Sequence, residues 1–173
     1  MIMPPRLRKV ALVLHITVSV GWVGAVAAYL PLDVTASTSQ DPQTLRAAYI
    51  SMELVAQRAI VPLAWATLAT GLLMSLGTKW GLFRHYWVIF SFILTVFAVA
   101  VLMTEMRAIN AYGSLAANPE TSDATLRALG GTLLHSVLGT VVLVIVLVMN
   151  MYKPRGMTRY GWRKKQDGRS EAT

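Results

Sequence analysis

Apolar residues in this chain are gathered into four long blocks rather than spread at regular helical or strand spacing. The blocks cover about residues 10–32, 55–77, 86–107 and 129–152. Each is close to the roughly 20 apolar residues that a helix needs to cross a bilayer. The pattern predicts an all-α polytopic membrane protein whose four helices form one transmembrane bundle with short connections.

The segment before the second block has a different pattern. Pro42 suits the first turn of a helix, and Asp41 suits its N-cap. From there residues 43–58 can form an amphipathic helix on the outer surface that runs into the membrane, with a kink at Pro62.

Charge is scarce and unevenly placed. Only 14% of the 173 residues are charged, whereas a soluble domain carries about 25%. The formal net charge is +8, and basic residues precede the first block, follow the second and fill a tail over residues 153–173. Before the tail they are Arg6, Arg8, Lys9, Lys79 and Arg84. The four spans place the bundle in residues 1–152, and residues 153–173 form a basic tail. The positive-inside rule predicts that both termini and the tail are cytoplasmic.

Several classes of protein are excluded or disfavoured. The absence of cysteine excludes disulfides, thiolate zinc sites and iron–sulfur clusters. The first block exceeds the roughly 7–15 apolar residues of a signal peptide, so we expect a retained span. Basic residues beside spans contact lipid headgroups, and we expect no nucleic-acid partner. Motifs for phosphate, nucleophile or zinc-hydrolase chemistry are absent, which leaves open whether the protein is an enzyme.

His15 is the first of the polar residues that the pattern places at membrane depth. Ionisable groups there are costly, and each warrants a functional hypothesis. His15 lies about 8 Å inside the inner edge of its span, by helical rise. It is either a ligand to a cofactor or a structural group that hydrogen-bonds Ser91, Thr95 or a neighbouring carbonyl.

A second set of polar residues lies towards the outer edge. It comprises Glu53, Arg58, Glu105 and His135. If these converge, a carboxylate beside an imidazole can form a proton relay, a metal site or the polar gate of a small transporter. The alternative is a set of salt bridges at the level of the loops, and we expect no resident metal.

At the inner edge, Arg84 and His85 lie in the segment "KWGLFRHYW". Aromatic residues favour headgroup depth, and arginine pairs there with phosphate, so the cluster has the composition of an interfacial belt. The alternative is a rim that binds part of a cofactor.

The first span, "LHITVSVGWVGAVAAYLPL", resembles the first span of HemJ-type protoporphyrinogen oxidases and of CopD-like membrane domains. Over almost the whole chain the closer resemblance is to the DUF2269 family of bacterial integral membrane proteins. Two segments carry it, "RAAYISMELVAQRAIVPLAWATLATGLLMSLGTKWGLFRHYWV" and "YKPRGMTRYG". This resemblance implies a bacterial inner-membrane protein without an established activity to inherit.

The HemJ-type resemblance implies that His15 is an axial ligand of haem b or lies against a porphyrin. In those enzymes a lysine of the third span accompanies the histidine, and Ser91 occupies the matching position here. Serine is a poor haem ligand, so the second ligand is left open. In this hypothesis Arg84 and His85 line the inner rim, and Arg84 or Arg8 meets the propionates.

These observations lead to three functional hypotheses. The first is a small inner-membrane protein that binds a tetrapyrrole, haem b, and transfers electrons. The second is a non-enzymatic accessory subunit that packs against a larger membrane complex or a second copy. The third is a small transporter with the outer polar gate.

Overall fold

The structure of the protein, a computed structural model, describes residues 3–78 and 80–170, with side chains as far as residue 166. Its helices, in chain order, are α1 (Pro5–Thr38), α2 (Pro42–Val55), a π-helical turn η1 (Ala56–Ile60), α3 (Val61–Gly77), α4 (Tyr86–Ala117), α5 (Asp123–Ala128), α6 (Leu133–Tyr152) and α7 (Arg159–Ser170). The described residues contain no β-strand. The all-α prediction is confirmed, and four helices are long and apolar enough to cross a membrane.

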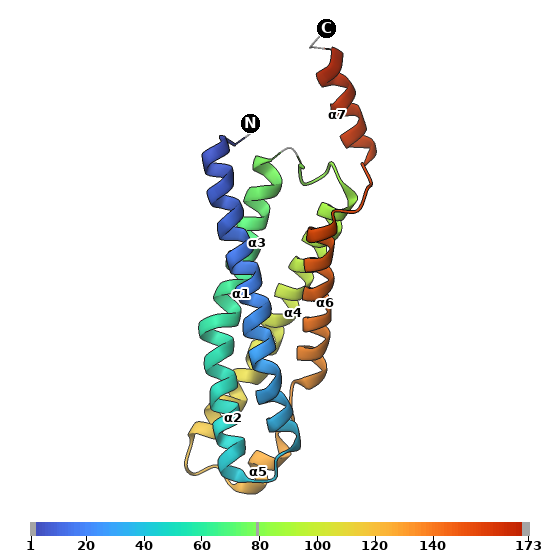
Figure 1. The fold of residues 1–173 in the computed structure, drawn as a ribbon. Helices are drawn as coiled ribbons and strands as arrows, with labels where there is room; N and C mark the ends of the chain where they lie inside the picture. Colours follow the sequence, from blue (N-terminus) through green and yellow to red (C-terminus); the bar gives the residue numbers. More distant parts are fainter. Residues whose placement is uncertain (1–2, 79, 171–173) are drawn as a thin grey trace.

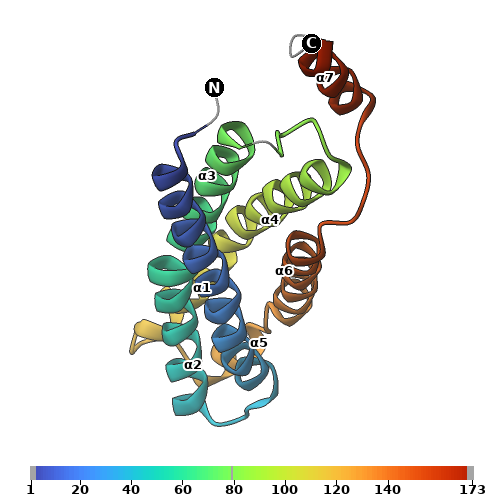
Figure 2. The same ribbon diagram turned by 45° about the horizontal axis from the view of Figure 1, so that its top comes forward.

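Those four membrane-length helices are α1, the continuous α2–η1–α3, α4 and α6. They stand side by side as one elongated bundle, with the N-terminal and C-terminal ends at the same end of it (Figure 1). Helix α1 packs against α2, α3 and α6, and α4 packs against α2, α3 and α6. Towards the end that holds the termini, α4 and α6 lean away from α1 and α3 (Figure 2).

The helices extend beyond the apolar blocks that predict them. Helix α1 runs on to Thr38 even though Pro31 lies inside it, and the Thr35 hydroxyl donates 2.8 Å to the Pro31 carbonyl. Helix α4 continues to Ala117, well past residue 107. The added turns form the outer end of the bundle, which is defined here as the end opposite to the termini.

Helix α2 begins where the sequence predicts, but it does not lie on an outer surface. Asp41 caps it by accepting 2.9 Å from the Thr44 amide. The Asp41 carboxylate also accepts 2.6 Å from the Thr44 hydroxyl, and this hydrogen bond, followed by the one from the amide, lowers the pKa of the carboxyl. The apolar stripe of the helix is buried against α1 and α4: Leu45, Ala48, Tyr49 and Met52. Because α1 and α4 continue outward beyond the apolar blocks, they supply the cover that keeps α2 upright. The π-helical turn before Pro62 joins α2 to α3 without a break.

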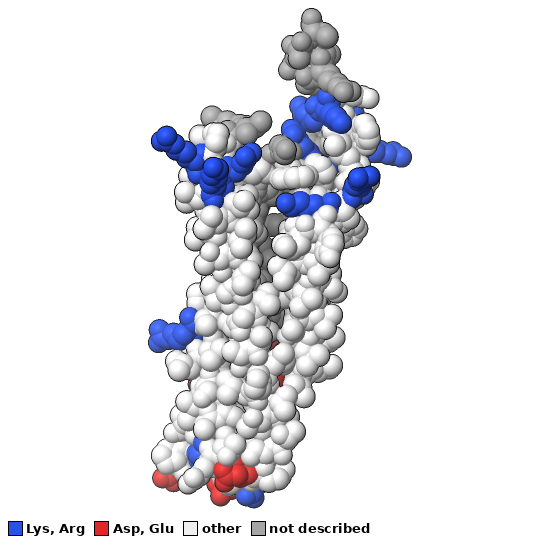
Figure 3. Space-filling view, in the orientation of Figure 1, with Lys and Arg blue, Asp and Glu red and all other residues white. Residues whose placement is uncertain are grey.

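The exposed surface of the bundle is apolar along most of its length and charged at its two ends. Large apolar side chains such as Val13, Ile93 and Val148 are exposed, as expected for contact with lipid. Lysine and arginine gather at the end that holds the termini, whereas aspartate and glutamate gather at the outer end (Figure 3). The composition and length of the helices make this a multi-pass membrane protein.

One carboxylate holds the outer end together. Asp33 of α1 is completely buried, and it accepts hydrogen bonds from the Thr132 amide (2.9 Å), the Thr132 hydroxyl (2.9 Å) and the Ser136 hydroxyl (2.7 Å). Thr132 is the N-cap of α6, so the positive end of the α6 dipole faces the carboxylate. Gly131 is needed beside it, because a Cβ there would lie 2.9 Å from Asp33 Oδ1.

The substitution Asp33→Asn tests this contact. The side-chain amide of asparagine has N–H donors in place of one acceptor oxygen of Asp33. The buried donors of Thr132 and Ser136 therefore lose an acceptor. We expect the free energy of unfolding in mixed micelles to fall by about 1–3 kcal/mol, measured by circular dichroism. Asp123→Asn, at an exposed position, is the matched control and should leave stability unchanged. Equal stability of the two variants would contradict the assignment.

Candidate functional site

His15 lies between α1 and α3 and is tied to α3. Its Nδ1 is 2.9 Å from the Thr70 hydroxyl, and its Cε1 would lie 3.2 Å from a Cβ at Gly71. Gly71 therefore makes room for the imidazole ring. Of the alternatives drawn from the sequence, a structural hydrogen bond is present, although its partner is Thr70 rather than Ser91, Thr95 or a carbonyl.

The Thr70 contact favours one tautomer of the neutral imidazole. The Thr70 hydroxyl has one hydrogen, and the Ala66 carbonyl lies 2.7 Å away as its nearest acceptor. With the hydrogen placed there, the Thr70 oxygen accepts from Nδ1–H of His15. The lone pair of Nε2 is left available, and no partner for Nε2 occurs within residues 3–78 and 80–166. This is the arrangement by which histidines bind metals through Nε2.

Arg84 and His85 lie apart from His15, in a cluster at the inner end. His85 donates from Nδ1 to the Trp80 carbonyl at 2.8 Å, and its ring lies 5.3 Å from the Trp80 ring, centroid to centroid. Trp87 packs edge-on against Trp80 at 5.6 Å. Arg84 and His85 line a hollow with residues of α7, and His15 is not among its lining residues. The aromatic surroundings agree with an interfacial belt.

The structure brings together two of the four outer residues. Glu105 of α4 and His135 of α6 face each other with Oε2 and Nδ1 3.6 Å apart. Glu53 instead packs against Gly113 and accepts 3.0 Å from the Gln57 amide. Arg58 is exposed on the π-helical turn, and no ion pair to it is found in the described part of the chain.

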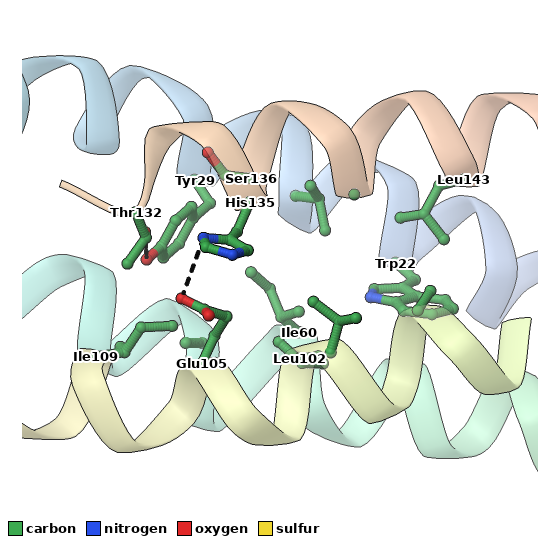
Figure 4. Close-up of a pocket in the computed structure, with 15 residues that line it drawn as sticks. Trp22, Tyr29, Ile60, Leu102, Glu105, Ile109, Thr132, His135, Ser136 and Leu143 are labelled. Carbon is green, nitrogen blue, oxygen red and sulfur yellow. Dashed lines mark hydrogen bonds and ion pairs between the residues drawn. The ribbon is translucent and has the colours of Figure 1, made fainter.

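The Glu105–His135 pair borders an apolar chamber of about 80 Å³ between α1, η1, α4 and α6. Figure 4 shows the pair on one side of Ile60 and Leu102, with Trp22 on the other. The chamber wall is otherwise built largely of aliphatic side chains, including Val26, Ile109 and Leu143. The His135 side chain is 49% exposed and that of Glu105 22%, so the pair forms the accessible edge of the chamber.

Trp22 leaves a donor unused in this chamber. The residue is 3% exposed, and its Nε1–H has no hydrogen-bond partner among the described residues. A buried donor without an acceptor costs about 1–3 kcal/mol. Such a group is stabilised by any molecule that enters the chamber and offers it an oxygen.

Tyr29 closes the chamber beside the ion pair. The Thr132 hydroxyl gives its hydrogen to Asp33, so it must accept from the Tyr29 hydroxyl, 3.0 Å away. Tyr29, Thr132 and Asp33 thus form one chain of hydrogen bonds that runs behind the chamber wall. The network therefore connects the Tyr29 hydroxyl, at the chamber wall, to the buried carboxylate of Asp33.

Sequence reasoning missed Trp22, Tyr29 and Asp33 as members of a site. Trp22 and Tyr29 resemble ordinary apolar positions of a span, and Asp33 resembles a loop residue because it follows the first apolar block. Seven-residue spacing places Trp22, Tyr29 and Ala36 on one face of α1. That spacing was the available signal, and Asp33 lies on the same face, four residues after Tyr29.

The tautomer of His15 can be measured directly. In protein labelled with ¹⁵N-histidine, we expect Nδ1 of His15 to carry the proton and Nε2 to have the chemical shift of an unprotonated nitrogen. Thr70→Val removes the acceptor and should release the ring into a mixture of tautomers, whereas Thr70→Ser should preserve the wild-type spectrum. A wild-type ring protonated at Nε2 would show that Nδ1 accepts the hydrogen bond from Thr70 instead of donating it.

Comparisons with known proteins leave the site to be interpreted from its own geometry. No protein-family model, curated protein or solved structure matches the chain. Within the described residues there is also no group of three His, Cys, Asp or Glu side chains that could hold a metal ion.

Proposed function

We propose that this multi-pass protein lies in the bacterial inner membrane with both termini in the cytoplasm. The segregation of charge supports this orientation, since the basic end of the bundle is the end that holds the termini (Figure 3). Lys79, which the sequence analysis counted among the basic inner residues, lies outside the described residues. The chamber then faces the outer half of the bilayer.

In this membrane the protein binds a small lipid-soluble molecule that carries a hydrogen-bond acceptor. The observation that carries the proposal is the Trp22 Nε1–H, buried and unpartnered in an apolar chamber. An apolar ring or short chain fits the aliphatic wall, and a carbonyl or ether oxygen on it satisfies the indole. The chamber, about 80 Å³ and accessible at the edge that Glu105 and His135 form, favours the end of a chain or a ring inserted by one edge over a large cofactor.

The acid–imidazole pair supplies the chemistry at the accessible edge. The gap of 3.6 Å between Glu105 and His135 is longer than a hydrogen bond, so a polar group of the ligand can lie between or beside them. A carboxylate accepts hydrogen bonds, and an imidazole has one nitrogen that donates and one that accepts when it is neutral. The pair can therefore orient the polar end of the ligand by hydrogen bonds.

A pair of isosteric probes tests the proposal. Acetophenone and ethylbenzene have the same ring and similar size, but only acetophenone carries a carbonyl acceptor. We expect the indole N–H resonance of Trp22, assigned with Trp22→Phe, to move on addition of acetophenone and to move much less with ethylbenzene. The reason is that only the carbonyl can accept from Nε1.

Two glycines provide matched variants for this experiment. A Cβ at Gly139 or at Gly24 meets no atom within 4 Å, but only Gly139 lines the chamber. Gly139→Leu should therefore fill the chamber and abolish the shift, whereas Gly24→Leu should retain it. Equal shifts with both probes, or a full response in folded Gly139→Leu protein, would refute the chamber as the site.

Binding of haem b at His15 is a second candidate, favoured by the free lone pair of Nε2. His15 can supply one axial ligand to the haem iron. The Ser91 hydroxyl, at the position that the HemJ-type resemblance assigns to the second ligand, is buried and lacks a hydrogen-bond partner in the described part of the chain. When bound, haem supplies one-electron transfer, while Thr70 holds the ring of His15 in the required tautomer.

An absorption spectrum tests this candidate. Protein purified in detergent after expression with added haem should give b-type bands in the reduced-minus-oxidised difference spectrum. His15→Ala should abolish these bands, and His85→Ala should leave them intact because His85 is held by Trp80 in a separate cluster. A colourless but folded wild-type protein would rule out haem at His15 and leave the chamber proposal untouched.

A further inference from the structure

The residues that line the outer chamber include three hydroxyl groups whose hydrogens are already committed. Those of Thr132 and Ser136 are donated to the carboxylate of Asp33, at 2.9 and 2.7 Å. The Tyr29 hydroxyl donates to Thr132 at 3.0 Å. A ligand in the chamber therefore finds no hydroxyl donor along this part of the wall.

The remaining polar groups lie at two opposite ends of the chamber. At one end Trp22 Nε1–H is buried and has no hydrogen-bond partner among the described residues. At the other end Glu105 Oε2 and His135 Nδ1 lie 3.6 Å apart. In Figure 4 the indole nitrogen is on the side of Trp22 that is turned toward this pair, with the aliphatic side chains of Ile60 and Leu102 between them. The chamber thus fits an apolar body with one polar atom at each end.

The spacing between the two ends follows from α1. Trp22 and Tyr29 are separated by two helical turns, about 10 Å along the axis, and Tyr29 lies beside the acid–imidazole pair (Figure 4). Hydrogen bonds of about 2.9 Å at each end leave about 4–5 Å between the two polar atoms of the ligand. Two oxygens on opposite carbons of a six-membered ring are about 5 Å apart, because each C=O bond of about 1.2 Å adds to the width of the ring. A para arrangement fits this spacing, whereas oxygens on adjacent carbons are too close together.

The acid–imidazole pair can hold the second oxygen in either of two chemical states. A neutral imidazole donates from one nitrogen, and a carboxylate only accepts. A quinone carbonyl accepts, so His135 can donate to it, and a quinol hydroxyl donates, so Glu105 can accept from it. Trp22 donates to the first oxygen in both states, because a carbonyl oxygen and a hydroxyl oxygen both have lone pairs.

The surface around the accessible edge of the chamber is apolar. The side chain of His135 is 49% exposed, and Leu134, Val137 and Leu138 near it on α6 are exposed as well. A hydrocarbon tail on the ring can therefore leave the chamber at this edge and lie against α6 in the bilayer. This favours a ring carried by a lipid over a small solute of the aqueous phase.

We propose that the ligand of the outer chamber is a lipid-soluble para-quinone together with its quinol. One oxygen accepts from Trp22 Nε1–H, and the other contacts the Glu105–His135 pair. The two states differ in the partner of that second oxygen, which is His135 for the quinone and Glu105 for the quinol. This inference rests on the proposed function, because it specifies the molecule that the same chamber binds.

Titration of the Trp22 indole N–H resonance of the full chain in detergent measures the affinities. The probes are 2,5-dimethyl-1,4-benzoquinone, the corresponding hydroquinone kept reduced with dithionite, and p-xylene, which has the same ring and methyl groups without oxygens. The chain contains no cysteine, so thiols do not add to the quinone. We expect both oxygenated probes to bind about tenfold or more tightly than p-xylene, because they give the buried donor an acceptor.

Two substitutions in the pair separate the two states of the ligand. Glu105→Gln removes the ionised acceptor and should weaken binding of the hydroquinone about tenfold, with a much smaller effect on the quinone, since hydrogen bonds to ionised groups are the stronger ones. His135→Phe keeps an aromatic ring but removes the donor, so it should weaken mainly the quinone. Glu53→Gln changes a carboxylate outside the chamber and is the matched control, with both affinities unchanged.

The outcomes distinguish this inference from the proposed function. If acetophenone shifts the Trp22 resonance but neither oxygenated probe binds more tightly than p-xylene, the chamber remains a binding site and the quinone assignment is wrong. Equal losses for both states in each variant of the pair would also overturn the assignment. If acetophenone fails as well, both the inference and the proposed function fall.

Discussion

The outer half of this protein depends on the burial of one carboxylate, that of Asp33. Removing an ionised group from water is expensive, and the cost is offset only where donors surround it. Here three donors come from Thr132 and Ser136, at the start of α6. The partner of the charge is a helix N-terminus with its hydroxyls rather than a cation. The interaction is therefore directional and sets the position at which α6 meets α1.

Other contacts at the outer end follow from that junction. The Tyr49 hydroxyl donates 2.8 Å to the Gly130 carbonyl, which joins α2 to the same segment that presents Thr132. Arg46 donates to the carbonyl of Ala116 in the last turn of α4 and to the carbonyls of Asn118 and Thr121 in the loop that follows. Arg127 donates 3.0 Å to the Gln40 carbonyl. These two arginines join the loops at the outer end to each other through backbone carbonyls.

The inner half is assembled differently. There α4 and α6 diverge from α1 and α3 (Figure 2), and the ends of the helices are joined through the turn before α4 and the C-terminal tail. Among the described residues, the His15 ring hydrogen-bonds to its near neighbour α3 alone, through Thr70. An intramembrane histidine thus has a structural bond on one nitrogen and a free lone pair on the other. A structural role and a ligand role for His15 are compatible, because a hydrogen bond from Nδ1 to Thr70 orients the ring and leaves Nε2 unprotonated.

The sequence by itself determined the helices, because the features that specify them are local. Long apolar blocks require helices in a bilayer, and Asp41 followed by Pro42 marks the start of α2. The count of four spans predicted that the two termini share one end. The upright position of α2 did not follow, since it depends on how far α1 and α4 extend beyond their apolar residues.

The site was predicted only in part, through Glu105 and His135, whose types stand out in an apolar sequence. Asp33 meets Thr132 across 99 residues of the chain. Trp22 stands out because no described residue offers an acceptor to its buried indole N–H. The contact between α7 and the turn before α4 likewise needs Gly161 beside the carbonyl of Arg84. Composition records which groups a chain carries, whereas hydrogen bonds and burial depend on positions to within a few tenths of an ångström. Only the tertiary structure decides those positions.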